Sequence, residues 1–266
     1  MRGFLWLCFG LCATLLGAEG PQRIASYSPG ATQTLLDLGC SERIVAATRW
    51  CPLPSAHAAA RTCDAFNPDL ETLRLAKPDL VVLPRLANPL WAERCTRAGL
   101  KVVVLNTENP ESVRQDLELL GQATGQTAAA QTLQARLADR VAARDKTLLV
   151  IWDGMMAGPE AYTTLALKQA GFKSPLPAGT WIKLDWETIV KANPDAVLWL
   201  DSTPTNGPIA PSQKHQKEMS EVIVVKELKC VKDARVFGGS SGSDWLPGTG
   251  VIQAAAKLRE IRQTLD

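Results

Sequence analysis

Histidine and tyrosine are scarce in this sequence of 266 residues, which contains two of each. His57 and His215 stand far apart without other metal ligands at a recognisable spacing, and the cysteines form no C-x-x-C pair. A metal site is therefore not expected. An excess of one charge is also lacking, because 29 basic residues face 27 acidic ones. This balance argues against a nucleic-acid partner, which would favour a strongly basic surface.

The sequence has no run of about 20 apolar residues, the length that a membrane-spanning helix needs. The longest candidate, Phe4 to Leu16, has 13 residues. It follows the basic start Met1-Arg2 and precedes small residues that end at Ala18, which is the pattern of a cleaved export signal. We therefore interpret residues 1–18 as a signal peptide and expect the mature protein to be exported and soluble.

Five cysteines follow this segment: Cys40, Cys51, Cys63, Cys95 and Cys230. An exported protein can form disulfides, and an odd number of cysteines leaves at least one thiol unpaired. Cys51 and Cys63 flank a short loop that contains prolines. They are the best candidates for a disulfide, and a pair of free buried thiols is the alternative.

Predicted strands and helices alternate along the rest of the chain, which indicates an α/β fold with a mostly parallel sheet covered on both faces. Residues 110–146 have a helical pattern with one break near Gly121 and Gly125. The last part of such a helix would span about 30 Å, which is enough to connect two lobes. We therefore predict an N-terminal lobe, a bridging helix and a C-terminal lobe over residues 19–124, 125–146 and 147–266.

Two stretches of 15 residues are nearly the same: DLETLRLAKPDLVVL starts at Asp69, and DWETIVKANPDAVLW starts at Asp185. Each pattern predicts a helix capped by its aspartate, a proline that ends the helix, and a buried strand. An acid near the positive end of a helix is stabilising, which explains Glu71 and Glu187 without a further role. Such helices also start at the sheet edge where ligands and partners meet open α/β folds. The two acids are therefore also candidates for a binding rim.

Tryptophan is abundant, with eight residues against two tyrosines. Trp50, Trp181 and Trp245 fall in loops next to predicted strands, where exposed aromatic side chains would suit a large, flat, apolar ligand. Trp245 ends the segment GGSSGSDW, in which Asp244 is a further candidate for ligand contact. The same segment has a G-x-S-x-G motif around Ser240, which is typical of serine hydrolases. Both histidines precede the motif and no helix follows directly, so we do not expect an enzyme.

The leader and the segments RIASYSPGATQTLLDLG and LETLRLAKPDLVV resemble the periplasmic substrate-binding proteins of ABC importers for vitamin B12 and siderophores. The resemblance covers about residues 22 to 265. It implies two Rossmann-like lobes bridged by one long rigid helix, with a ligand in the cleft between them. It also implies a monomeric carrier in the periplasm that delivers its ligand to an ABC permease dimer in the inner membrane.

Within this family the members that bind vitamin B12 are the most similar, which implies a corrinoid as the transported ligand and no catalytic cofactor. Trp50 and Trp181 match aromatic residues that line the ligand site in such proteins, and Phe66 lies one position from a third. Glu71 and Glu187 match the two acids that contact arginines of the permease.

The resemblance also assigns a ligand-holding loop that starts at Ser243, Asp244 and Trp245 and continues through Leu246, Pro247 and Gly248. Gly248 stands where the family has an arginine, so one polar contact of that loop is missing here.

Other ligands and one other class of protein remain open. A ferric siderophore would call for basic side chains in the cleft, for which Arg49 and Arg85 are candidates. Haem would call for an axial tyrosine or histidine, for which Tyr27 and His57 are candidates. An exported enzyme with Ser240 as its nucleophile is the alternative from a different class.

Overall fold

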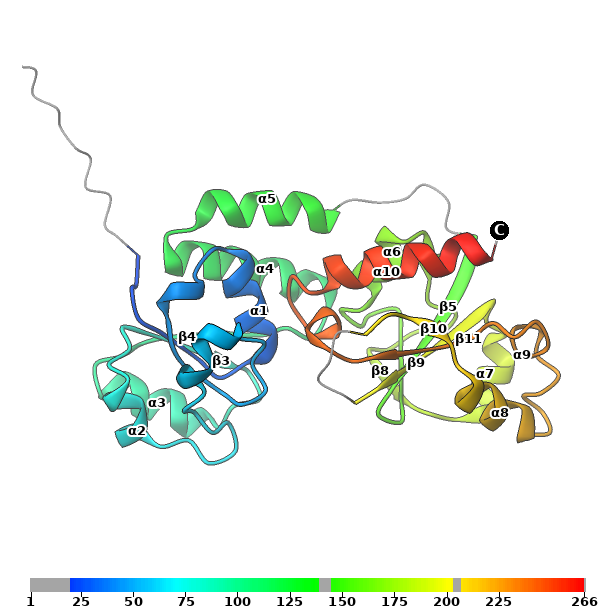
Figure 1. The fold of residues 1–266 in the computed structure, drawn as a ribbon, viewed down its shortest axis with the longest axis horizontal. Helices are drawn as coiled ribbons and strands as arrows, with labels where there is room; N and C mark the ends of the chain where they lie inside the picture. Colours follow the sequence, from blue (N-terminus) through cyan, green and yellow to red (C-terminus); the bar gives the residue numbers. More distant parts are fainter. Residues whose placement is uncertain (1–19, 139–144, 203–206, 266) are drawn as a thin grey trace, which may run out of the picture.

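The computed structural model describes residues 20–138, 145–202 and 207–265. The expected signal peptide, residues 1–18, lies outside these ranges. Figure 1 shows two lobes, each with strands at its centre and helices around them, which confirms the predicted α/β class. None of the helices in the described ranges is long and apolar enough to cross a membrane.

The N-terminal lobe is built on a four-stranded parallel sheet in the order β2-β1-β3-β4. The central strands are buried runs of apolar residues, as expected for a parallel sheet with helices on its faces. The strands are β1 (Ile24–Ser26), β2 (Ile44–Ala47), β3 (Leu80–Pro84) and β4 (Lys101–Leu105). The helices are α1 (Pro29–Asp37), α2 (Leu70–Leu75), α3 (Pro89–Arg97) and α4 (Pro110–Thr124), with short 3-10 turns at Ser41–Arg43 and Ser55–Ala60.

The C-terminal lobe has a larger, mixed sheet in the order β10-β11-β9-β5-β6-β8, and β7 also pairs with β5. Its centre, β11-β9-β5, is parallel, whereas β10, β6 and β8 add to its edges in antiparallel fashion. The strands are β5 (Lys146–Trp152), β6 (Met155–Ala157), β7 (Phe172–Lys173), β8 (Trp181–Lys183), β9 (Ala196–Asp201), β10 (Ala210–Pro211) and β11 (Val236–Ser240). The helices are α6 (Thr164–Gln169), α7 (Trp186–Ala192), α8 (Gln213–Glu221), α9 (Lys229–Lys232) and α10 (Val251–Thr264), with a 3-10 turn at Ser243–Trp245.

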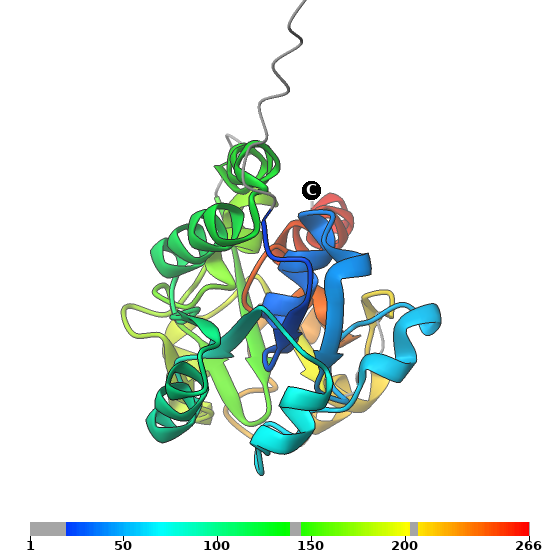
Figure 2. The same ribbon diagram turned by 90° about the vertical axis from the view of Figure 1, so that its left-hand side faces the viewer.

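Helices α4 and α5 (Thr127–Ala138) pack side by side on top of the N-terminal lobe, as Figures 1 and 2 show. Helix α5 also reaches the C-terminal lobe. Gln134 Nε2 of α5 donates to the Arg114 carbonyl oxygen of α4 at 3.1 Å, and Gln169 Nε2 of α6 donates to the Arg136 carbonyl oxygen of α5 at 2.9 Å. Helix α5 therefore contacts both lobes.

The expected bridging helix, residues 125–146, corresponds to α5 over its first half, and residues 139–144 lie outside the described ranges. The expected break near Gly125 is present, since α4 ends at Thr124 and Gly125 has a φ of 73°. The proposed domain boundaries stay a prediction.

A second connection joins the lobes directly, where the start of α1 meets the segment that precedes α10. At position 30 a Cβ atom would lie 2.1 Å from the carbonyl oxygen of Pro247, so only glycine allows this approach. The backbone N–H of Thr249 donates to Thr34 Oγ1 at 3.3 Å. One hydrophobic core continues across this seam from Leu35 of α1 to Leu258 of α10. The two lobes are therefore in direct contact along this seam.

Candidate functional site in the cleft between the lobes

Two adjoining hollows open between the lobes, and residues of both lobes line each of them. The smaller hollow has a volume of about 500 Å³ and is lined by Ser28, Pro84, Arg85, Leu86, Leu105, Asn106, Thr107, Glu108, Tyr162, Thr180, Trp181 and Pro247. The larger has a volume of about 710 Å³ and is lined by Pro29, Arg49, Trp50, Cys51, Pro52, Leu53, Arg61, Trp152, Asp153, Ser202, Ser241, Gly242, Ser243 and Leu246. Cavities of this size that combine aromatic and polar walls are typical of small-molecule sites.

The two hollows are parts of one cleft. Neighbouring residues line them on both sides, with Ser28 and Pro29 from the N-terminal lobe and Leu246 and Pro247 from the C-terminal lobe. Trp152 of the larger hollow also contacts Trp181 of the smaller one, with ring centroids 6.0 Å apart in an edge-to-face arrangement. We refer to the two hollows together as the cleft.

The C-terminal lobe contributes an aromatic wall, which we define as Trp152, Tyr162 and Trp181. Trp152 ends β5, and the Asp153-Gly154 turn that follows has positive φ at both residues, as a tight hairpin requires. Strand β6 therefore runs back beside β5 and pairs with β8, which begins at Trp181. This hairpin brings the two tryptophans together.

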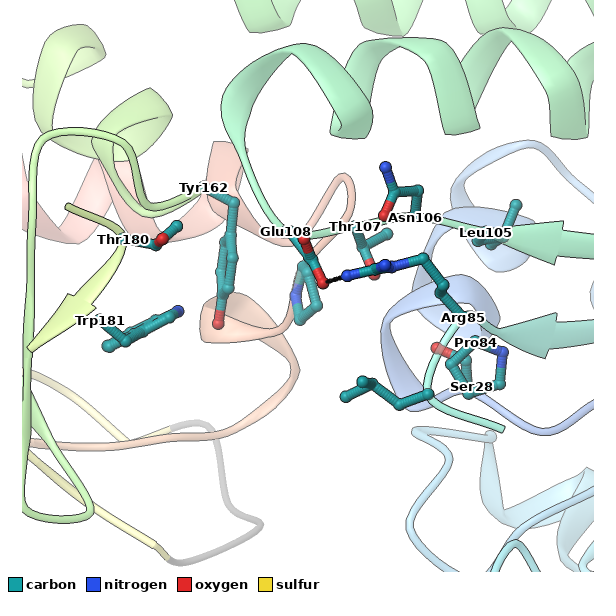
Figure 3. Close-up of a pocket in the computed structure, with 12 residues that line it drawn as sticks. Ser28, Pro84, Arg85, Leu105, Asn106, Thr107, Glu108, Tyr162, Thr180 and Trp181 are labelled. Atoms are coloured by element: carbon teal, nitrogen blue, oxygen red, sulfur yellow. Dashed lines mark hydrogen bonds and ion pairs between the residues drawn. The ribbon is translucent and has the colours of Figure 1, made fainter. Parts of the chain in front are cut away.

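Tyr162 completes the aromatic wall and is fixed by its hydroxyl group. Its ring lies 5.9 Å from that of Trp181, and its Oη donates to the backbone carbonyl of Trp245 at 2.8 Å. Burial raises the pKa of the Tyr162 phenol, so the side chain stays neutral. Figure 3 shows Tyr162, Thr180 and Trp181 on one side of the smaller hollow, facing Arg85 and Glu108 on the other.

The N-terminal lobe contributes three arginines to the cleft, and each has a partner within the protein. Arg85 forms an ion pair with Glu108, drawn as a dashed line in Figure 3. Arg61 donates to the carbonyl oxygens of Cys51 and Leu53 at 3.4 and 3.0 Å. The guanidinium carbon of Arg49 lies 4.9 Å from the ring centroid of Trp50, within the range of a cation–π contact.

Four residues expected to contact a ligand do line the cleft. Trp181 and Pro247 border the smaller hollow, and Trp50 and Leu246 border the larger one. Trp50 is 52% exposed, so its ring is accessible from the cleft.

Trp245 and Asp244 lie in the interior and not in the cleft wall, which corrects the expectation for both. Trp245 is 1% exposed and belongs to the hydrophobic core. Asp244 is buried and forms an ion pair with Lys257 of α10. Pattern analysis placed both residues in an exposed loop, but the chain turns inward at Ser243–Trp245 to connect the sheet with α10.

Gly248 and Phe66 also lie away from the two hollows. Gly248 packs on α1, where a Cβ atom would lie 2.6 Å from Thr34 Oγ1, so the arginine that the family has at this position would not fit. Phe66 is 84% exposed and borders a separate hollow of about 410 Å³ next to α3. Neither residue lines the two hollows, and their contact with a ligand stays a prediction.

The expected disulfide between Cys51 and Cys63 is not formed, and all five cysteines of the described ranges are free and buried. Cys63 packs with Tyr27 and Trp91 in one hydrophobic cluster, whereas Cys51 belongs to another and its sulfur lies 3.2 Å from Thr48 Oγ1. The two side chains therefore enter different clusters, although their loop is short. Burial raises the pKa of the Cys63 thiol, which makes it less reactive.

The two repeated stretches form equivalent helices at the surface. Asp69 caps α2 by accepting from the Thr72 backbone N–H at 2.7 Å, and Asp185 caps α7 by accepting from the Thr188 N–H at 2.8 Å. Hydrogen bonds from the threonine side chain and backbone lower the pKa of each aspartate. Glu71 and Glu187 are exposed in the first turns of these helices, one on each lobe, and both helices lie in the lower half of Figure 1. Their role in docking stays a prediction.

Pattern analysis missed Trp152, Tyr162 and Glu108. Trp152 was recognisable as the last residue of a strand, at the edge where α/β proteins bind ligands. Tyr162 lies in the loop before α6, which begins at Thr164, and no sequence motif marks it. No local signal marks Glu108, because its partner Arg85 lies 23 residues away.

The residues considered for haem and for hydrolysis are placed elsewhere. Tyr27 is 4% exposed and packs edge-on against Trp91, and burial raises the pKa of its phenol. His57 contacts Ser41 and Glu42, both at 3.2 Å, and does not line the cleft. Ser240 is the last residue of β11 and accepts from the Gly207 N–H at 2.6 Å. A nucleophile elbow would need a helix directly after this strand, but α10 begins only at Val251.

Comparison with known proteins places this fold and cleft. A model of the family described as periplasmic binding protein matches residues 24–240. The chain belongs to the periplasmic binding protein family. Proteins of this family bind solutes and are not enzymes.

Individual curated proteins resemble the chain at 24–26% identity. A cobalamin-binding protein of Halobacterium salinarum is 26% identical over 197 residues, which cover 67% of this chain and 53% of the relative. An uncharacterised ABC transporter substrate-binding lipoprotein of Bacillus subtilis is 24% identical over 227 residues, covering 77% and 70%. The chain thus spans about half the length of the first of these curated relatives.

A solved structure confirms the fold. The periplasmic haem-binding protein of Vibrio cholerae has a TM-score of 0.71 and 18% identity, covering 91% of this chain and 98% of that one. The described ranges contain no group of three or more His, Cys, Asp or Glu side chains suited to hold a metal ion.

Proposed function

We propose that this chain is the substrate-binding protein of an ABC importer and that it captures a corrinoid, such as vitamin B12, in the cleft. The observation that carries the proposal is the aromatic wall of Trp152, Tyr162 and Trp181, which extends along both hollows. In the larger hollow the exposed Trp50 of the other lobe lines the same space as Trp152. A corrin ring is large, flat and apolar on its faces, and stacked aromatic side chains provide matching surface. The similarity to a cobalamin-binding protein supports the same ligand.

The charges of the cleft suit a ligand with many amides and few negative charges. Arg85 and Glu108 balance each other in the smaller hollow. In the larger hollow Arg49 and Arg61 exceed the single acid, Asp153, by one charge. Cobalamin carries neutral amide side chains around its ring and one phosphodiester. The neutral hollow fits the amides, and the hollow with Arg49 fits the phosphodiester.

Delivery to the permease is proposed to use Glu71 and Glu187. Both acids are exposed at helix starts on different lobes, and each can pair with an arginine of one half of a two-fold permease. The proposal includes export by the segment 1–18, a periplasmic location and a monomeric carrier.

Titration of the purified protein with cyanocobalamin in a calorimeter tests the ligand. We expect saturable binding of one corrinoid per chain at micromolar concentration or below. Absence of heat at tens of micromolar, with the protein shown to be folded by circular dichroism, would refute the corrinoid assignment.

Haem is the second candidate, favoured by the excess positive charge of the larger hollow and by the haem-binding protein of the same fold. Two propionates could pair with Arg49 and Arg61. Against haem, Tyr162 is the tyrosine of the cleft, and its hydroxyl is already bonded to the backbone of Trp245. Titration with haemin, followed by its Soret absorption, decides between the two: tighter binding of haemin than of cyanocobalamin would make haem the ligand. A ferric siderophore, for which Arg49 and Arg85 are the candidate contacts, is tested by a parallel titration with a ferric siderophore as the probe.

A further inference from the structure

The structure assigns Glu108 as a specificity-determining residue that disfavours ligands carrying a carboxylate at the smaller hollow. The assignment rests on the proposed function in one respect, because it takes the cleft to be the ligand site. Arg85 is the basic residue of this hollow and Glu108 the acidic one. Their ion pair leaves the hollow without net charge.

The sheet register fixes both residues opposite the aromatic wall. Strands β3 and β4 are parallel neighbours, and Pro84 pairs with Leu105 at their carboxyl ends. Arg85 is the next residue after β3, and its N–H donates to the Leu105 carbonyl at 2.8 Å. The turn that follows β4 therefore brings Glu108 to the Arg85 guanidinium.

The backbone at Glu108 is held by the start of the following helix. The N–H groups of Glu108 and Asn109 both donate to Ser112 Oγ at 3.0 Å, and Asn109 caps α4. Because this capping box belongs to a helix of 15 residues, the Glu108 backbone is fixed next to Arg85. The ion pair thus belongs to the built wall of the cleft.

The charge pair has a direct consequence for selection. An anionic group on the ligand can pair with Arg85 only by displacing Glu108, and it meets the negative charge of Glu108 when it does so. A neutral amide can donate to Glu108 and accept from Arg85 at the same time. The pair of Arg85 and Glu108, which can bind a neutral amide, therefore disfavours a carboxylate at the same place.

The test uses two probes that differ by one charge: cyanocobalamin and its monocarboxylic acids, in which one propionamide is hydrolysed to a propionate. The quantity measured is the ratio of the two dissociation constants, for each of the b-, d- and e-isomers. In Glu108→Gln we expect the isomer whose carboxylate reaches Arg85 to gain about fivefold relative to cyanocobalamin, because the pair is half exposed and partly screened. In Arg85→Gln the ratio should move in the opposite direction, since Glu108 then remains alone.

Glu93→Gln is the matched control. It removes the acid of an exposed pair with Arg97 on α3, changes the net charge by the same amount, and lies outside the cleft. Its ratio should equal that of the wild type. If no isomer shifts in Glu108→Gln, or if Glu93→Gln shifts as much, Glu108 has no role in selection.

Ligand binding by the wild-type protein distinguishes failure of the proposed function from failure of the role of Glu108. If wild type binds haemin and no corrinoid, the corrinoid assignment fails and the role of Glu108 is tested on haemin alone. Glu108→Gln should then bind this dicarboxylate about fivefold more tightly than wild type, measured against Glu93→Gln. Unchanged haemin affinity would overturn the assignment of Glu108 in that case.

Discussion

The two lobes are constructed alike at their repeated stretches and differently at the cleft. In both repeats the first aspartate caps a helix, the residue before the proline has a positive φ, and the second aspartate accepts hydrogen bonds at the start of the neighbouring strand. These residues are Asp69, Lys77 and Asp79 in one lobe and Asp185, Asn193 and Asp195 in the other. What the lobes share therefore serves folding.

The differences between the lobes lie on the surfaces that face other molecules. The C-terminal lobe lines the cleft with Trp152, Tyr162 and Trp181, whereas the N-terminal lobe lines it with Trp50 and arginines that are paired within the protein. On the proposed function, the lobes would divide ligand recognition, with ring contact mainly on one side and polar selection on the other.

The largest effect, on uptake, should follow from reversing the charge of the exposed acid that each lobe is proposed to use for docking on the permease. Reversing both acids, Glu71→Lys with Glu187→Lys, places like charges opposite the arginines of the permease. Uptake of labelled cyanocobalamin by the native organism, with the chromosomal gene replaced, should fall at least about 100-fold because two charge-assisted pairs are lost.

The matched control for this double variant reverses Glu93 and Glu221, which are exposed acids on α3 and α8, one in each lobe. Uptake should be retained in the control, and the purified double variant should bind ligand as wild type does. Weakened binding in Glu71→Lys/Glu187→Lys would assign the acids to the cleft or to stability.

The unequal division of ring contact is tested by removing one tryptophan from each side. Trp181→Ala should weaken corrinoid binding by about 30-fold, because it removes stacking surface and the support of Tyr162 and Trp152. Trp50→Ala should cost about fivefold, since this ring is half exposed and has fewer aromatic neighbours. Calorimetry measures both.

Trp186→Ala is the control for the tryptophan variants, because Trp186 packs on Trp199 at 6.3 Å and lines neither hollow. Its affinity should match wild type. Equal losses in Trp181→Ala and Trp50→Ala would show that the lobes contribute evenly.

Asp244 tests whether the segment before α10 serves the core or the ligand. Asp244→Asn leaves Lys257 without its buried partner, so the free energy of unfolding should fall by about 2 kcal/mol. Urea denaturation measures this loss, and ligand affinity of the folded protein should be retained. Asp233→Asn, which affects a more accessible pair with Arg235, should change stability by less than about 0.5 kcal/mol. A loss of ligand affinity without a loss of stability in Asp244→Asn would show that Asp244 belongs to the ligand site.

Features that depend on neighbouring residues were predictable from the sequence. The caps Asp69 and Asp185, the buried parallel strands and the break near Gly125 each follow from a few adjacent residues. Composition near predicted strand ends also led to Trp50 and Trp181, which do line the cleft, although Trp181 begins β8 and does not lie in a loop.

Features that depend on strand order were not predictable. Arg85 meets Glu108 only because β3 and β4 are neighbours, and Trp152 meets Trp181 only because β6 lies between β5 and β8. Trp245 was misplaced for the same reason. Its loop has the composition of an exposed segment, but it fills the space between the sheet and α10.

The smallest predicted effect concerns a difference between the two docking acids. Lys191 Nζ lies 2.8 Å from Glu187 Oε1, whereas Glu71 has leucine at the corresponding position, Leu75, four residues later. In the proposed docked complex an arginine of the permease would therefore compete with Lys191 for Glu187. An exposed pair of this kind contributes about 0.3–0.5 kcal/mol, so Lys191→Ala should increase the affinity for the permease about twofold.

Half-saturation of uptake by added binding protein in spheroplasts measures the change, with Lys217→Ala, from the pair with Glu221 on α8, as the control. Unchanged half-saturation in Lys191→Ala would mean that both acids meet the permease on equal terms, and the lobes would then be alike at the docking rim as well as in their fold.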